Sequence, residues 1–518
     1  MWFELPVTVA LVICVPGMLF AIGGIEAREA GNNSVGQERL PGPIRPVDQV
    51  GQFKGQSDIG IVLHPGSTQY DAASGSYTVA GSGENMWFSE DAFHFVWQEV
   101  SGDHVSLAAT INFVGSGGDS HRKALLMIRQ SLDADSAYVD VAVHGDGLKS
   151  IQYRDERGAI TREINAPAST SKRLRLEKRG DYFYMLMGDD SGFQLVAGSP
   201  RIHLTGPFYV GFGVCAHEKS VIQRAVFSNV DLNFSSAPEN SPVLHSTLEV
   251  VPIATPTDRR VVYATAGRVE APNWTSDGGD LIFNRAGRLE KVSVSKGKPV
   301  AIETGLTGHC NHDHGISPDG RSLAITELQE NGKSGVFIVP YAGGTPRRVT
   351  RLSTSYWHGW SPDGKSLAIS VEQNGHFDIY NVDADGANES RLTQDSGSND
   401  GPEYSPDGAY IYFTSDRNGT SQIWRMRPDG SGQEQVTTDE FGNWFPHISP
   451  DGRKMIFLSY AKGVTGHPAD KDVTLRIMTL TDRKITVLDK MLGGEGTINA
   501  PSWSPDSLEV AFVSYQYF

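Results

Sequence analysis

The phrase Ser-Pro-Asp-Gly recurs through the second half of the chain and restricts its fold more than any other sequence feature. Four full copies and two divergent copies begin at Thr275, Ser317, Ser361, Ser405, Ser449 and Ser504. The copies follow one another at intervals of 42, 44, 44, 44 and 55 residues. Self-similarity with a period of roughly 40–50 residues is typical of a β-propeller, in which each repeat forms one four-stranded blade.

The residues around each copy support this interpretation. Each copy is followed by an apolar run such as KSLAISVE or AYIYFTSD, which reads as a strand. Proline fixes φ and glycine accepts the left-handed conformation, so Pro-Asp-Gly predicts a tight turn. We therefore expect this turn to join the first two strands of every blade, and the residues before it to form the innermost strand.

Counting strands gives an expected number of blades. The sixth copy has only two strands before Phe518, and the missing pair is found upstream, in Ser246–Ala254 and Arg260–Thr265. A ring closed by combining strands from both ends of the repeat region satisfies this pattern. The sequence thus predicts a six-bladed propeller over residues 244–518.

The region before the repeats is also predicted to be all-β. Residues 51–234 alternate apolar and polar positions in runs such as HVSLAATINFVG and GPFYVGFGVCAH, bounded by Gly, Asp and Asn. This pattern favours antiparallel strands in a two-sheet, jelly-roll-like β-sandwich. Polar, Pro- and Gly-rich stretches at residues 28–50 and 235–243 read as linkers on either side of it.

The N-terminus reads as a targeting segment. Residues 5–25 are nearly all apolar and are followed by the polar stretch EAREAGNN. This length suits a cleaved signal peptide over residues 1–27 or an uncleaved membrane anchor. We expect a periplasmic or secreted protein that contacts a membrane only if this segment is retained.

Composition excludes some partners. The 518 residues include 45 Lys and Arg against 61 Asp and Glu, a formal charge of −16. Such an excess of negative charge argues against binding to nucleic acid or to an anionic membrane. Three cysteines are too few for a disulfide framework. Cys14 lies in the leader, and we expect Cys215 and Cys310 to be buried free thiols.

Aligning the six copies predicts which residues meet at one mouth of the propeller. Equivalent positions on the inner strands project at one height into the central funnel, where propellers bind their ligands. His, acidic and aromatic residues gather two to five positions before the turn in several copies. The predicted ligand-binding residues are Glu270, Asn273, Tyr356, Trp357, Asp400, Glu403, Trp444 and Asn499.

The segment GHCNHDHGI is the densest of these positions and suggests a metal. Strand alternation would place Cys310, His312 and His314 on one face, with His309 and Asp313 on the other. Imidazoles with a nearby carboxylate suit Zn²⁺ or Mn²⁺. The predicted ligands of one divalent metal are His312, His314, His358 and His447. Alternatively, these histidines bond to loop carbonyls and line a hydrated channel.

The repeat resembles a known family. The stretch from Asp400 to Thr437, DGPEYSPDGAYIYFTSDRNGTSQIWRMRPDGSGQEQVT, is similar to the WD40-like PD40 repeats of TolB-like six-bladed propellers. Residues 74–111 resemble concanavalin A-like or laminin G-like β-sandwich modules, which are often attached to secreted carbohydrate-active proteins. The repeats are also similar to those of oligogalacturonate lyases, a resemblance that implies a metal held by histidines in the funnel.

These patterns leave three functions open. The first is an exported two-domain binding protein whose propeller mouth recognises a glycan or an envelope protein. The second is a metal-dependent lyase or hydrolase acting on oligosaccharides or polysaccharides in the same funnel, for which no catalytic residue is assigned. The third is a structural scaffold with a plugged funnel. The sequence does not decide whether the protein is an enzyme.

Overall fold

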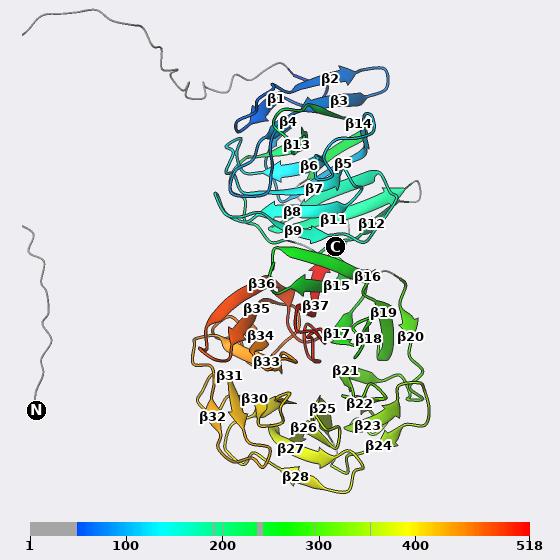
Figure 1. The fold of residues 1–518 in the computed structure, drawn as a ribbon, viewed down its shortest axis with the longest axis vertical. Coiled ribbons are helices and arrows are strands. Elements are labelled where there is room, and N and C mark those ends of the chain that lie inside the picture. The colour runs from blue at the N-terminus through cyan, green and yellow to red at the C-terminus, as the bar shows by residue number, and fades with distance from the viewer. Residues whose placement is uncertain (1–48, 190–191, 199, 236–241, 296, 353) are drawn as a thin grey trace, which may run out of the picture. The chain divides into compact units, whose positions relative to one another are not determined.

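The computed structural model describes residues 49–518, except 190–191, 199, 236–241, 296 and 353. All 37 regular elements in this part of the chain are β-strands (Figure 1). No described segment forms a helix long and apolar enough to cross a membrane. The predicted leader at 1–27 and most of the predicted linkers at 28–50 and 235–243 lie outside the described residues.

The propeller is present, but with five four-stranded blades rather than the six that we predicted. Each blade is a separate antiparallel sheet whose strands follow chain order. Blade 1 contains β17 (Val269–Trp274), β18 (Asp280–Arg285), β19 (Arg288–Ser293) and β20 (Val300–Ala301). Blade 2 contains β21 (Cys310–Ile316), β22 (Ser322–Leu328), β23 (Ser334–Pro340) and β24 (Arg347–Arg348). Blade 3 contains β25 (Ser355–Trp360), β26 (Ser366–Gln373), β27 (His376–Asp383) and β28 (Glu389–Arg391). Blade 4 contains β29 (Asn399–Tyr404), β30 (Ile411–Ser415), β31 (Gln422–Met426) and β32 (Glu434–Gln435). Blade 5 contains β33 (Gly442–Ile448), β34 (Lys454–Tyr460), β35 (Lys471–Thr479) and β36 (Ile485–Gly493).

The sixth repeat explains the difference in blade number. As predicted, strands from both ends of the repeat region pair: β15 (Leu244–Pro252) lies between β16 (Asp258–Ala266) and β37 (Glu509–Tyr517). The expected innermost strand, however, makes only an isolated bridge from Trp503 to Val510. In addition, β16 pairs in parallel with β9 (Arg162–Asn165). The three closing strands therefore belong to a larger sheet instead of forming a sixth blade.

The repeated turn has the predicted structure and position. In blades 2 to 5, Ser-Pro-Asp-Gly joins the first strand to the second, and the four glycines have φ between 68° and 72°. L-residues rarely adopt this left-handed conformation, which explains why glycine stands there. The turn leaves the innermost strands β17, β21, β25, β29 and β33 next to one another around the centre of the ring (Figure 1).

The N-terminal region contributes two sheets. The ten-stranded sheet has the order β1-β4-β13-β6-β7-β8-β9-β16-β15-β37, and the seven-stranded sheet has the order β12-β11-β10-β5-β14-β3-β2. The first contains β1 (Gly55–Ile59), β4 (Phe93–Val100), β6 (Lys123–Arg129), β7 (Tyr138–His144), β8 (Lys149–Arg154) and β13 (Phe208–Cys215). The second contains β2 (Ser67–Asp71), β3 (Ser76–Gly81), β5 (His104–Phe113), β10 (Arg173–Arg179), β11 (Tyr182–Asp189), β12 (Gly192–Leu195) and β14 (Gln223–Ser235).

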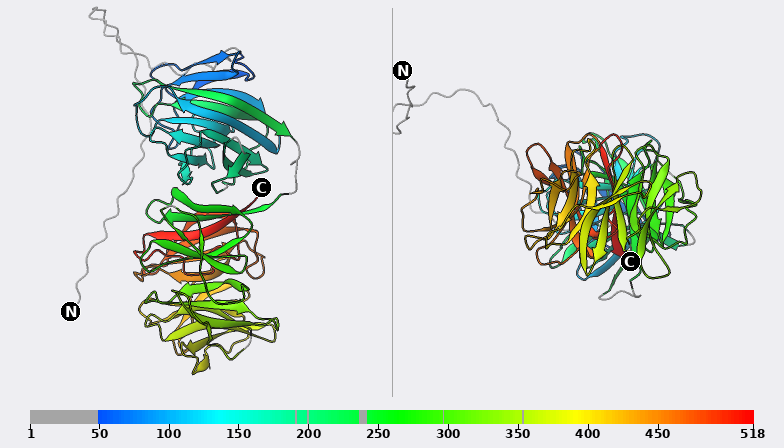
Figure 2. Two further views of the ribbon diagram at one scale, coloured as in Figure 1. Left: turned by 90° about the vertical axis from the view of Figure 1, so that its right-hand side faces the viewer. Right: turned by 90° about the horizontal axis from the view of Figure 1, so that it is seen from below.

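Figure 2 shows the strands of this region from two further sides. Side chains from both of these sheets form one hydrophobic core. Leu126 and Val141 come from the ten-stranded sheet, Leu107 and Leu174 come from the seven-stranded sheet, and all four are fully or almost fully buried. All described regular elements of this region are strands, which confirms that it is all-β. Cys215 and Cys310 are buried and free, as the sequence predicted.

Candidate functional site

Each innermost strand is irregular at the same place, a few residues before the repeated turn. The pairing of the first two strands shifts register between Glu270 and Asn273, Cys310 and His314, Trp357 and Gly359, Asp400 and Glu403, and Trp444 and His447. A bulge bends the strand and redirects its side chains. The irregularities thus lie on the residues that the alignment of repeats placed at the mouth.

The bulge in β21 changes which residues of the His-rich segment come together. Strict alternation predicted His312 and Asp313 on opposite faces of this strand, and that prediction is wrong. Because the register shift lies between Cys310 and His314, His312 Nε2 comes within 3.5 Å of Asp313 Oδ1. Asp313 is therefore a member of the site rather than a residue of the opposite face.

Three carboxylates and three imidazoles alternate in a closed ring at this mouth, which we call the acid–imidazole ring. Its members in order are Glu495, His467, Asp400, His358, Asp313 and His312. The nitrogen–oxygen distances are 3.5 Å for Glu495–His467, 3.6 Å for His467–Asp400, 3.3 Å for Asp400–His358, 4.0 Å for His358–Asp313, 3.5 Å for Asp313–His312 and 3.0 Å for His312–Glu495. Three inner strands supply four members, and two long loops supply His467 and Glu495.

The ring carries both positive and negative charge at neutral pH. Burial lowers the pKa of His467, but the neighbouring carboxylates of Asp400 and Glu495 outweigh it and raise the value to about 10. For His312, burial is likewise outweighed, here by Asp313, Glu495 and Glu270, and the pKa rises to about 9. Burial acts to raise the pKa of Asp400 and Glu495, yet the neighbouring imidazoles hold both values well below normal. His312 and His467 are therefore cations that face anions.

The ring does not satisfy all of its own hydrogen-bonding groups. Asp313 Oδ1, His358 Nε2 and His467 Nδ1 are buried atoms without a hydrogen-bond partner. The Asp313 and His358 side chains are only 3% and 7% exposed, so bulk water does not compensate them. Leaving a buried polar atom unpaired costs about 1–3 kcal/mol. A bound polar group at the ring would recover part of this free energy.

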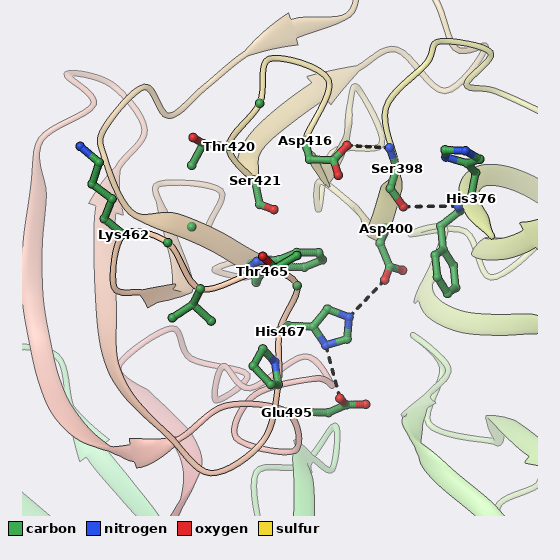
Figure 3. A pocket seen from close by; sticks show the side chains of 18 of the residues that line it. His376, Ser398, Asp400, Asp416, Thr420, Ser421, Lys462, Thr465, His467 and Glu495 are labelled. Carbon is green, nitrogen blue, oxygen red and sulfur yellow. Dashed lines mark hydrogen bonds and ion pairs between the residues drawn. The ribbon is translucent and has the colours of Figure 1, made fainter.

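A cavity of about 900 Å³ opens beside the ring. Figure 3 shows His467 on its wall, between Asp400 and Glu495. The wall also includes Phe377 and Trp444 together with polar residues from blades 3 to 5. A concave site with aromatic surface and a few convergent polar groups is the usual form of a small-molecule site.

Two of the four predicted metal ligands belong to the ring, and two do not. His312 and His358 both lie within 4.0 Å of Asp313 Oδ1. His314 is fully buried, which lowers its pKa to about 4, and neither of its ring nitrogens has a hydrogen-bond partner. His447 Nδ1 lies 2.5 Å from Glu403 Oε2, and its Nε2 contacts the carbonyl of Ile498. Across the described residues, no three His, Cys, Asp or Glu side chains are grouped as metal ligands.

Four of the predicted ligand-binding residues lie at or near the ring and cavity. Asp400 is a ring member, and Trp444 lines the cavity with its ring centroid 4.5 Å from that of His467. Burial raises the pKa of Glu270, which interacts with His312. The Tyr356 ring lies 5.9 Å from that of Phe377, a residue of the cavity wall.

The other four predicted residues make structural contacts. Asn273 accepts a hydrogen bond from the backbone N–H of Ile316, and Glu403 accepts the equivalent bond from Ile448, so both connect neighbouring blades. Trp357 is 1% exposed and packs against Gly315, where a Cβ atom would lie 2.0 Å from its ring. Asn499 is buried and accepts a hydrogen bond from the Gly496 N–H.

Sequence comparison missed His467 and Glu495 because neither occupies a repeated position. His467 lies between β34 and β35, and Glu495 lies between β36 and β37. Both loops belong to the last interval, which has 55 residues where the three intervals before it have 44. The extra length was the available signal, since long loops in compact domains are often functional.

Comparison with known proteins agrees with the repeat architecture. The family model described as the TolB beta propeller domain matches residues 316–514. An uncharacterised protein of Agrobacterium fabrum, Atu1656, is 46% identical over 289 residues, which cover 56% of this chain and 98% of that protein.

Solved structures give a similar result. A candidate TolB from Agrobacterium tumefaciens is 46% identical and superposes with a TM-score of 0.52, covering 53% of this chain and 99% of that one. TolB from Acinetobacter baumannii is 18% identical with a TM-score of 0.38, covering 56% of this chain and 77% of that one. Given the identity and coverage of the Agrobacterium relatives and the match of the family model, this chain belongs to the TolB-like β-propeller family.

Proposed function

We propose that the chain is an exported binding protein that takes up a hydroxyl-rich ligand, such as an oligosaccharide, in the cavity at the propeller mouth. The observation that carries this proposal is the opening of a cavity of about 900 Å³ directly beside the acid–imidazole ring. An envelope protein that inserts side chains into the same cavity is the other partner that this site could take.

The chemistry of the cavity wall suits sugar hydroxyls. Protonated His467 supplies a hydrogen-bond donor, whereas Asp400 and Glu495 supply acceptors. A hydroxyl group both donates and accepts, so it can bond to both kinds of neighbour. Phe377 and Trp444 add aromatic surface against which the apolar face of a sugar ring can pack.

A binding screen with a matched pair of variants tests the proposal. Full-length protein is screened against immobilised glycans and against envelope extracts, and ligands are then measured by calorimetry. Asp400→Asn should lower affinity at least about tenfold, because it removes a buried charged partner. Asp407→Asn changes the exposed aspartate of the turn in the same blade and should leave affinity unchanged. Equal affinities for the two variants would contradict a site at this mouth.

The second candidate is a metal-dependent lyase or hydrolase acting on oligosaccharides or polysaccharides. It is favoured by the convergence of His312 and His358 on an unpaired oxygen of Asp313. The Zn²⁺ or Mn²⁺ site predicted at four histidines stays a prediction, which elemental analysis of protein purified without chelator tests directly. Stoichiometric metal that is lost in His312→Ala but not in His447→Ala would favour an enzyme centred on the ring.

Export and the identity of the N-terminal module belong to the same proposal. We infer a periplasmic or secreted location from the apolar leader, and a concanavalin-like β-sandwich over residues 51–234 from the alternating strands. The shared core of the two N-terminal sheets supports this module. Cell fractionation and N-terminal sequencing of the mature protein test the location and the cleavage site.

A further inference from the structure

His467 occupies the place that a cationic group of a ligand would take. Its Nε2 lies 3.6 Å from Asp400 Oδ2 and its Nδ1 lies 3.5 Å from Glu495 Oε2 (Figure 3). Asp400 comes from an inner strand, whereas His467 comes from the loop between β34 and β35, outside the repeated elements. The protein thus neutralises two carboxylates at the cavity wall with a side chain from an added loop.

The contacts that hold His467 there are loose. Both nitrogen–oxygen distances exceed those of a good hydrogen bond, and Nδ1 is a buried atom with no hydrogen-bond partner. An ammonium group that approached closer could replace these contacts without breaking a well-formed bond. At a shorter distance, an ammonium group can therefore compete with the imidazole for the two carboxylates.

The surroundings of His467 also favour a cation. Its ring centroid lies 4.5 Å from that of Trp444 and 5.0 Å from that of Phe445. Aromatic faces attract ammonium groups within about 6 Å of the ring centre, and the attraction increases when water is excluded. A ligand cation that replaced the imidazole would meet the same aromatic pair.

The cavity as a whole carries excess negative charge. Its wall contains four carboxylates but only two cationic side chains. The carboxylates are Asp400, Asp416, Glu440 and Glu495, and the cations are Lys462 and His467. Clefts lined mainly by one sign of charge concentrate ligands of the opposite sign. A polyanionic ligand would meet repulsion here, whereas a cationic one would be attracted.

We propose that the ligand of this cavity is an amino sugar with a free, protonated amine, which displaces His467 and pairs with Asp400 and Glu495. This inference rests on the proposed glycan-binding function and specifies the ligand class. The identifying group is the ammonium, because two carboxylates and two aromatic rings converge on the position that it would occupy. Neutral sugars and uronic acids offer no group of that charge.

Calorimetry with three oligosaccharides of equal length tests the proposal: fully deacetylated chito-oligosaccharide, its N-acetylated form, and the matching cello-oligosaccharide. The deacetylated form should bind at least about tenfold more tightly than the other two, and this advantage should shrink at high salt. Equal binding of the N-acetylated or neutral form would overturn the amine assignment.

Removing the imidazole of His467 should change ligand affinity in opposite directions under two models. Affinity increases if the ligand displaces His467, and it decreases if His467 contacts the ligand. His467→Gln removes the internal cation, so affinity for the deacetylated oligosaccharide should increase severalfold. His467→Lys places a permanent ammonium between the carboxylates and should abolish the preference for the free amine. If His467→Gln instead weakens binding of this oligosaccharide, His467 is a ligand contact and the displacement model is wrong.

Two controls separate this inference from the proposed function. Asp407→Asn should bind like the wild type, and melting temperatures establish that each variant is folded. If neutral sugars bind and Asp400→Asn weakens them, the glycan site stands and only the amine assignment fails. If none of the three oligosaccharides binds and the glycan screen is also negative, the proposed function fails with it.

Discussion

At the turn end of each blade, the same hydrogen bonds within the turn recur from blade to blade, whereas the mouth end is built from contacts between several blades. In the turn, the Ser361 hydroxyl donates to Asp363 Oδ1 at 2.7 Å, and Asp363 Oδ1 accepts from the Lys365 N–H. The same Ser–Asp bond recurs in the turns at Ser317, Ser405, Ser449 and Ser504. At the mouth, by contrast, Asp400 of blade 4 has partners from blade 3 and from a loop of blade 5.

This difference explains why one end is repetitive and the other is not. A turn that satisfies its own hydrogen bonds can be copied into every blade without adjusting its neighbours. A side chain at the mouth must match residues of other blades, so the six copies there carry different residues that complement one another. Substitutions should therefore act locally at the turn end and collectively at the mouth.

The largest effect should come from opening the ring of blades, because both ends depend on its closure. A chain that begins at Val269 lacks β15 and β16 and leaves β37 without the partner that pairs along its length. Unpaired strand edges promote association, so this chain should aggregate and lose its cooperative melting transition. A chain that begins at Leu244 keeps both strands, loses only the short pairing of β16 with β9, and serves as the control. We expect it to be monomeric and folded, as the predicted division into domains requires.

Coupling between substitutions is the next largest effect and tests the collective nature of the mouth directly. Asp400→Asn and His467→Gln each remove one side of a buried pair, so their effects on the free energy of unfolding should be non-additive by about 1–3 kcal/mol. Asp319→Asn and Asp451→Asn, in the turns of blades 2 and 5, should be additive within about 0.5 kcal/mol. Chemical denaturation of the two double-mutant cycles measures both values. Additivity at the mouth would mean that its residues act independently.

The same difference between local and long-range contacts decides which features of the fold could be predicted from the sequence. The turns follow from a short-range pattern, Pro-Asp-Gly, and the β15–β37 pairing follows from counting the strands of the repeats; both were predicted correctly. The blade number was not, because it depends on whether the residues before Ser504 form a strand and on the partner of β16, which are tertiary contacts.

The mouth was predicted in part for the same reason. Aligned repeats identified His312, His358 and Asp400, since these stand at repeated positions. Asp313 was assigned to the wrong face because a bulge interrupts the alternation. His467 and Glu495 were not predicted, because loops outside the repeat bring them to the ring. Aligning repeats therefore predicts the site residues that stand on the repeated strands, but it does not predict the residues that loops outside the repeat add to them.

The dependence of stability on pH tests whether His467 at the mouth carries a charge. The folded-state pKa of His467 is raised to about 10 from 6.5, so its contribution is fully present below pH 6.5 and is lost as the pH rises through 10. The melting temperature of the wild type should therefore fall more between pH 7 and 10.5 than that of His467→Gln. In acid the titrating groups are instead Asp400 and Glu495. Their pKa values are lowered, so their contribution is present above about pH 4.5 and is lost as the pH falls below it. Parallel curves at high pH would show that the imidazole carries no charge in this site.

The smallest effect should come from the glycine of a single turn. Gly452 has a φ of 71°, and no atom lies within 4 Å of the position where a Cβ would be. Gly452→Ala therefore creates no clash and should cost only the conformational penalty of about 1–2 kcal/mol. Gly452→Asn should cost less, because asparagine tolerates the left-handed region better.

The sixth repeat indicates that such a replacement is tolerated. Ser507 occupies the same position with a φ of 64°, and its hydroxyl accepts a hydrogen bond from the Asp451 N–H, which offsets part of the conformational cost. Denaturation curves of the two Gly452 variants measure the conformational penalty. Calorimetry with the ligand of the mouth measures whether the substitution also changes ligand affinity. Unchanged ligand affinity is expected in both variants, since the hydrogen bonds of this turn involve none of the residues of the mouth. A change in affinity as large as that of Asp400→Asn would show that the two ends of the blade are coupled.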